Sequence, residues 1–320
     1  MRSLPVLTAL VLVVSLEACA DKTFYNMSTP ASSQADQYVE TEDLGKLPNK
    51  KIAITSFGIE YDTDVVYGKR NPKITGMASG SYRSETSTLD LSNEVMQQIA
   101  DDAYGKLVKD LTAAGYEVIP YDTYKQSPAY QSLIKVIGEE KSPIKVTFRY
   151  GDSETNSNSD ALVFAPTGMV WYQVAAGEQG FPRANTWTNV GQQISGAVSR
   201  GFSGEQPHVK SEIALADALN ASVLKVYYIV SPVRSYVSAG IPVKGKTIVG
   251  SGETRMAFRT PGASTMHFTF AKKHPPLDGN AFVRLQKDVQ LDTEKNTYQD
   301  IENHLDAARE MFITKLKAGK

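Results

Sequence analysis

Few residues that could bind a metal ion or act as a nucleophile lie close together in this chain. The four histidines, His208, His267, His274 and His304, show no metal-ligand spacing, and Cys19 is the single cysteine. Zinc sites need three or four Cys, His or acidic ligands at characteristic spacings. The sequence therefore predicts no metal centre and no cofactor, and it places His267 in a strand and His304 on a solvated helix face.

A glycine-rich stretch at residues 191–204, GQQISGAVSRGFSG, is the nearest approach to a phosphate-binding loop. Such a loop needs a lysine and then a serine or threonine after its last glycine. Here Phe202 and Ser203 follow Gly201, so nucleotide binding is not expected. We expect a protein without catalysis. A periplasmic hydrolase stays open as an alternative, because a Ser/His/Asp triad assembles in space and has no fixed spacing.

A second stretch, from about residue 167 to residue 207, combines aromatic residues with many Gly, Gln, Asn and Ser residues. Clustered aromatic residues among small polar ones are typical of interfaces. We therefore expect an insertion that presents a partner surface, formed by Trp171, Tyr172, Phe181, Trp187 and Phe202. The alternatives are a loop whose aromatic residues pack onto a sheet, a loop that dips into a membrane, and a surface that binds cell-wall glycan.

The amino terminus has the pattern of an export signal. Arg2 precedes the apolar run LPVLTALVLVVSL at residues 4–16, which is too short to span a bilayer because a span needs about 20 apolar residues. Two cleavage sites are open. Cleavage before Cys19 leaves its thiol at a new amino terminus, whereas cleavage after Ala20 removes the thiol.

Leu16-Glu17-Ala18-Cys19 resembles the lipobox of bacterial lipoproteins, in which a small residue precedes the acylated cysteine. Glu17 departs from the pattern, since that position is usually small or uncharged. The resemblance implies that residues 1–18 are removed and that Cys19 carries lipid. Ala20 in the next position implies sorting to the outer membrane, with the protein facing the periplasm. Cleavage after Ala20 would instead give a soluble periplasmic or secreted protein.

The next residues, 19–48, are rich in Ser, Thr, Gln, Asp and Pro. Their five acids and two lysines give a local net charge of −3. Such a composition buries too little apolar surface to offset the entropy of ordering. We therefore expect a flexible tether over 19–48, followed by a single domain over 49–320.

The charge of the whole chain limits its partners. With 34 basic and 35 acidic residues, the net charge is −1. This balance does not indicate the basic face that binds nucleic acid. The expected partners are the lipid bilayer, through Cys19, and envelope proteins, including further copies of this chain.

Hydrophobic patterns in the domain predict alternating strands and helices. The run KKIAITSFGIEY at 50–61 predicts the first strand, and apolar residues at helical spacing predict a helix over 90–114. Gly115 ends this helix before the strand YEVIPY, and the strand–helix–strand order favours parallel pairing. Residues 69–88 are predicted as a surface loop, and a last helix is predicted over 298–317.

Together these elements predict an α/β fold, with a mixed, partly parallel sheet packed by amphipathic helices. KIAITSFGIEY, the 90–114 helix and GYEVIPY resemble the opening of envelope domains of the CsgG and TolB amino-terminal type. IALADALNASVLKVYYIV resembles a later phrase of these domains, in which a helix ends and a buried strand begins. The resemblance implies an α/β envelope module used in assembly or secretion, and it departs over 165–207.

Overall fold

The computed structural model describes most of the chain after residue 25. The described residues are Asn26, 28–70, 82–89, 91–138, 142–151, 155–172, 207–230, 232–235, 255–258, 265–269, 280–285 and 297–319. They form an α/β domain in which helices pack against a mixed, partly parallel sheet, as the sequence predicts.

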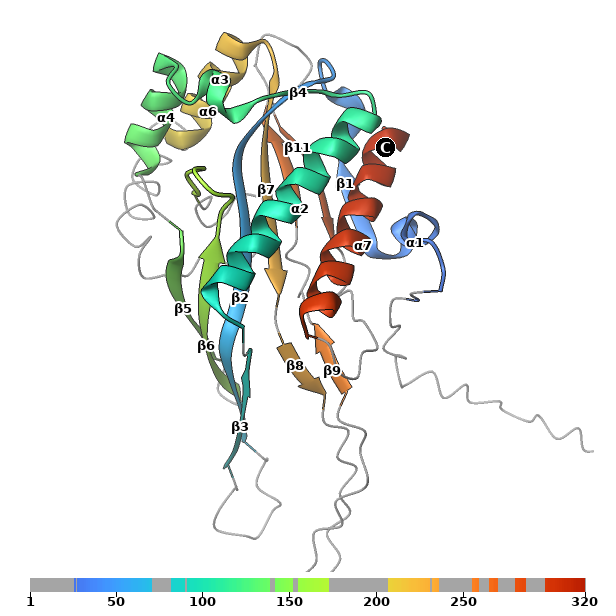
Figure 1. Cartoon of the computed structure of the whole chain (residues 1–320), viewed down its shortest axis with the longest axis vertical. Coiled ribbons are helices and arrows are strands. Elements are labelled where there is room, and N and C mark those ends of the chain that lie inside the picture. Colours follow the sequence, from blue (N-terminus) through green and yellow to red (C-terminus); the bar gives the residue numbers. More distant parts are fainter. Residues whose placement is uncertain are drawn as a thin grey trace, which may run out of the picture.

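Nine strands of the described chain form one sheet around the long strand β2 (Lys51–Arg70). Strand β2 pairs in parallel with β4 and β7, and antiparallel with β3 and β6. Across the sheet the order is β1 (Val39–Glu42), β11 (Asn280–Leu285), β10 (Thr265–Thr269), β7 (Ser222–Val230), β2, β6 (Thr155–Phe164) and β5 (Ile144–Gly151). Strands β3 (Tyr82–Thr88) and β4 (Glu117–Ile119) pair with opposite ends of β2 (Figure 1). Strands β8 (Pro232–Ser235) and β9 (Arg255–Phe258) form a separate pair.

Helices cover both faces of this sheet (Figure 1). On one face, α2 (Asn93–Ala113) and α7 (Thr297–Ala318) share a core with Phe57, Ile59 and Tyr61 of β2. On the other face, three shorter helices share a core with Ala53 and Val223. These helices are α3 (Tyr121–Tyr124), α4 (Pro128–Ile137) and α6 (Pro207–Leu219).

The predicted 90–114 helix is confirmed as α2. Its N-cap residue is Ser92, whose hydroxyl accepts a hydrogen bond from the Val95 backbone N–H. The apolar stripe is buried, with Leu107 fully enclosed at its centre. Gly115 adopts φ +85°, a left-handed conformation that most residues avoid, and the chain then enters β4, parallel to β2. The predicted parallel pairing is therefore confirmed.

Strand β2 is longer than the predicted 50–61 strand, and the predicted loop over 69–88 is partly wrong. Residues 64–70 of β2 pair antiparallel with β3, so 82–88 belong to the sheet. A strand of 20 residues spans about 65 Å, whereas the 21 residues of α2 span about 32 Å. Strand β2 therefore continues well past the helix that covers it.

The prediction of a flexible tether over the whole of residues 19–48 is wrong for residues 28–48. Residues 31–38 form α1 (Ala31–Tyr38), in which Ala31, Ala35 and Tyr38 are buried against the core that contains α7. Asp36 forms an ion pair with Lys315, and β1 then pairs with β11. Composition misses this docking because few residues of the segment make the apolar contacts, and those of α1 are spaced i, i+4 and i+7. The domain thus begins near residue 28 and not at residue 49.

The last helix is confirmed as α7, but the prediction of a solvated His304 is wrong. His304 is fully buried. It lies three residues after Ile301 and four before Ala308, both buried, so helical geometry places it within the apolar stripe.

Candidate functional site

Trp171 and Tyr172 lie in the core and not on a partner surface, so the prediction is wrong for these two residues. Their exposed fractions are 4% and 6%. Along one side of β2, β4 pairs with residues 51–53 and β6 pairs with β2 from Ile59 onward. Residues 54–58 of β2 therefore pair with neither strand on this side. The segment 166–172 runs into this interval, where the Ser56 hydroxyl donates to the Tyr172 carbonyl and accepts from the Tyr172 N–H.

Gly58 makes this docking possible. A Cβ atom at Gly58 would lie 2.2 Å from Nε1 of Trp171, so the indole occupies the space that any other side chain would need. The Trp171 ring also stacks on the ring of Tyr227 of β7, with the two ring centroids 6.1 Å apart. The segment 166–172 is therefore held to the sheet through both its aromatic residues.

A buried polar cluster connects this segment to α6 and β7. Its four side chains are Thr55 on β2, Tyr172, Glu212 on α6 and Lys225 on β7, and all four residues are buried. The ammonium of Lys225 lies 3.0 Å from each carboxylate oxygen of Glu212. The Tyr172 hydroxyl donates to Glu212 Oε1 at 2.9 Å and lies 2.8 Å from Thr55 Oγ1.

Electrostatics fix the direction of these hydrogen bonds. Burial raises the pKa of Tyr172 well above its usual value of 10.0, and the negative charge of Glu212 raises it further. The phenol therefore keeps its proton, which it donates to Glu212. Because that proton is used, the Thr55 hydroxyl donates to the phenol oxygen. The cluster is a chain of donors that ends on one carboxylate, which Lys225 also neutralises.

Two members of the cluster lie on either side of residues 173–206 in the sequence, and residues 173–206 are outside the described residues. Tyr172 immediately precedes this segment, and Glu212 lies in the second turn of the helix that begins at Pro207 after it. The hydrogen bond between Tyr172 and Glu212 thus links the described residues on either side of 173–206, within the insertion predicted over 167–207. Phe181, Trp187 and Phe202 lie outside the described residues, and their partner role stays a prediction.

Sequence patterns gave no role to Thr55, Glu212 or Lys225. One signal was present, because Lys225 interrupts the otherwise apolar strand SVLKVYYIV, which is buried throughout. A lysine in such a strand requires a buried acid, but the partner lies 13 residues earlier on a helix. Only the packing of α6 on β7 identifies Glu212 as that acid.

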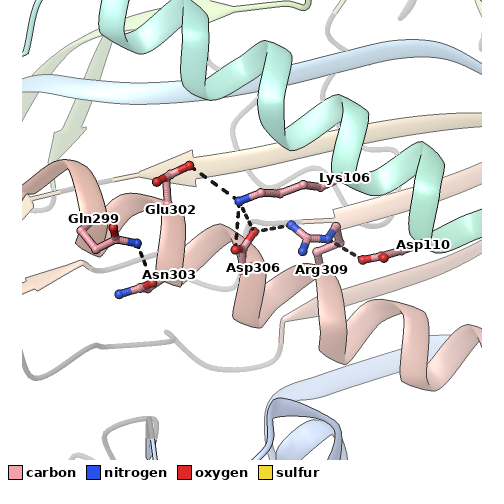
Figure 2. Close-up of polar contacts among 7 residues, drawn as sticks. All are labelled: Lys106, Asp110, Gln299, Glu302, Asn303, Asp306 and Arg309. Carbon is pink, nitrogen blue, oxygen red and sulfur yellow. Dashed lines mark hydrogen bonds and ion pairs between the residues drawn. The ribbon is translucent and has the colours of Figure 1, made fainter.

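A second charged cluster lies between α2 and α7 (Figure 2). Lys106 of α2 contacts Asp306 at 3.0 Å and Glu302 at 3.6 Å. Arg309 of α7 contacts Asp110 at 2.7 Å and also pairs with Asp306. Partly exposed pairs of this kind stabilise a protein by about 1 kcal/mol or less each, so their main effect is to fix the two helices side by side.

A third feature is the part of the sheet that passes beyond α2 and α7 (Figure 1). We call it the sheet extension. It consists of residues 64–70 of β2, β3, residues 155–160 of β6 and residues 147–151 of β5.

The register gives the sheet extension two different faces. Ser87, Val65, Ser159 and Phe148 form one row across the strands, and Glu85, Tyr67, Ser157 and Tyr150 form another. Because alternate residues of a strand share a face, Ser157 and Ser159 continue the face of the buried Ala161 and Val163. The rows between these are more polar, with Asp64, Asp160 and Thr147 in one and Val66, Asn158 and Arg149 in the next.

Two kinds of feature are absent from the part of the chain that the structure describes. Among those residues, no group of three or more His, Cys, Asp or Glu side chains is arranged to hold a metal ion. No described helix is long and apolar enough to cross a membrane. Cys19, the predicted lipidation site, precedes the described residues.

No protein-family model matches the chain, and no curated protein or solved structure matches it either.

Proposed function

We propose that this protein is a lipid-anchored, non-catalytic envelope protein that binds other envelope proteins or further copies of itself. The observation that carries the proposal is the sheet extension. It continues the sheet past its helical cover and gathers Val65, Tyr67, Phe148 and Tyr150 on one face by register.

The composition of that face favours protein binding. Aromatic residues are enriched in protein interfaces, and their combination with serine gives rigid apolar contacts beside adaptable hydrogen bonds. An antiparallel sheet usually keeps one face against a core and one in water. The rows with Phe148, Tyr67 and Tyr150 are the ones that we propose to bind a partner.

Photo-crosslinking in the native envelope tests this proposal. Tyr67, on the aromatic face, is replaced by a photoreactive phenylalanine analogue, and illuminated envelopes are examined by immunoblot and mass spectrometry. We expect covalent adducts with a defined protein or with a second copy of the chain. Aromatic interface residues often contribute about 2 kcal/mol or more to binding, so such a contact should be populated long enough to be captured.

The same analogue at Lys109, an exposed residue of α2, is the matched control and should give at most trace adducts. The analogue at Trp187 tests the partner surface predicted in residues 173–206. Adducts from position 187 alone would show that residues 173–206, and not the sheet extension, form the binding surface. Equal adducts from positions 67 and 109 would overturn the proposal.

The short distance to the anchor supports a domain held close to a membrane. With α1 folded onto the domain, only residues 20–27 separate Cys19 from Ser28. At about 3.3–3.6 Å per residue, this stretch reaches at most about 30 Å. On the proposal that Cys19 is acylated, the domain is held within that distance of the bilayer.

Cys19→Ser should release the protein from the membrane fraction or leave the precursor uncleaved. One acyl chain gives only marginal membrane binding, whereas several chains anchor stably, because each buried methylene contributes about 0.8 kcal/mol. Fractionation and metabolic labelling with a fatty acid measure the effect. An unlabelled wild-type protein in the soluble fraction would show that cleavage follows Ala20 instead.

A further inference from the structure

The two ends of residues 173–206 are joined to the domain partly through shared bonds. Ser56 and Tyr121 also bond to Tyr172 and Val170 independently of α6. Tyr172, at one end, is bonded to Thr55 of β2 and to Glu212 of α6. Glu212, at the other end, is bonded to Tyr172 and to Lys225 of β7. Each end thus depends on a group that the other end supplies.

We propose that the Thr55–Tyr172–Glu212–Lys225 cluster couples these ends, so that residues 166–172 and the first turns of α6 open and close as one unit. Tyr172 is the positioning residue in this arrangement. The inference goes beyond the proposed function, since it holds whether partners bind the sheet extension or residues 173–206.

The coupling follows from burial. If α6 lifts from the sheet, the carboxylate of Glu212 leaves both Lys225 and the Tyr172 phenol in a layer that excludes water. If residues 166–172 lift instead, Glu212 loses its phenol donor. A partly satisfied buried network is less stable than either a complete or an absent one. Opening either end therefore weakens the other.

The aromatic packing extends the coupled unit to the sheet. Trp171 fills the space above Gly58 and stacks on Tyr227, so residues 166–172 cannot shift along β2 without uncovering both. A force applied to either end of residues 173–206 therefore acts on β2, α6 and β7 together. If a partner binds residues 173–206, the flanking residues 166–172 and α6 would keep their relative positions.

Native-state hydrogen exchange of the full-length Tyr172→Phe variant tests this coupling. The substitution removes one hydroxyl and keeps the ring in place. Because a hydrogen bond to a charged group is lost, we expect exchange to accelerate about tenfold to a hundredfold in residues 166–172 and in α6 alike. Exchange in the centre of α2, on the opposite face of the sheet, should stay unchanged.

Two variants make the result specific. Tyr61→Phe also removes a buried tyrosine hydroxyl, one that donates to the Met96 carbonyl on the opposite face of the sheet, and it should leave hydrogen exchange in both segments unchanged. Thr55→Val removes the bond between the phenol and β2 but keeps the bond between Tyr172 and Glu212. This variant should accelerate hydrogen exchange in residues 166–172 and in α6 together. Faster exchange of only one segment in Tyr172→Phe, or equally faster exchange of both segments in Tyr61→Phe, would overturn the coupling.

Discussion

Glu212→Ala should lower the free energy of unfolding by about 3–5 kcal/mol, because it leaves the ammonium of Lys225 buried without this carboxylate. The loss includes the hydrogen bond from Tyr172. Urea titration followed by circular dichroism gives the free energy and its slope with denaturant. A change of this size is a large share of the total stability of a typical domain.

The matched control lies on the same helix. Lys210 is exposed near the start of α6, and Lys210→Ala should change the free energy of unfolding by about 0.5 kcal/mol or less. The double variant Glu212→Leu/Lys225→Met removes both charges and keeps similar volume, so it should recover most of the loss. If the double variant is as unstable as Glu212→Ala, the loss comes from packing and not from the broken ion pair with Lys225.

Leu107→Asp should unfold the domain at room temperature. Leu107 is fully buried between α2 and the sheet, and a carboxylate there has no cation to pair with among the apolar side chains of the core. Destabilisation of more than about 5 kcal/mol is expected for a charge placed in such a layer. Loss of near-ultraviolet circular dichroism and of a cooperative thermal transition would show it.

Lys109→Asp is the matched control, two residues away on the exposed side of α2, and its thermal midpoint should stay within a few degrees of wild type. Lys106, although also polar, is unsuitable because it contacts Asp306 and Glu302 of α7. Equal tolerance of Leu107→Asp and Lys109→Asp would mean that α2 does not pack through its Leu107 face.

The helices could be predicted from sequence because their signals are local. In α2 the cap at Ser92, the apolar stripe through Leu107 and the glycine at 115 all lie within one stretch. The same holds for α7, where the spacing from Ile301 to Ala308 also contained the evidence that His304 is buried. Reading that histidine by its chemistry, and not by its position on the helix, led to the wrong prediction.

The candidate site could not be predicted in the same way, because its parts meet only through sheet register. Thr55 and Lys225 become neighbours when β2 pairs in parallel with β7, and a register shift between Ile54 and Ser56 lies at this point. Trp171 fits against Gly58 only because neither β4 nor β6 pairs with residues 54–58 of β2. Neither relation has a spacing along the chain that a sequence pattern could detect.

The pairing of β1 with β11 sets an order of events during synthesis. Val39 lies opposite Leu285, so its partner is made 246 residues later. Ribosomes add about 5–20 residues per second, which leaves the first edge strand waiting for roughly 12–50 s. Helix α1 likewise packs in one core with α7, which begins only at Thr297. This edge of the sheet and the packing of α1 with α7 therefore form only after residues 280–318 have been made.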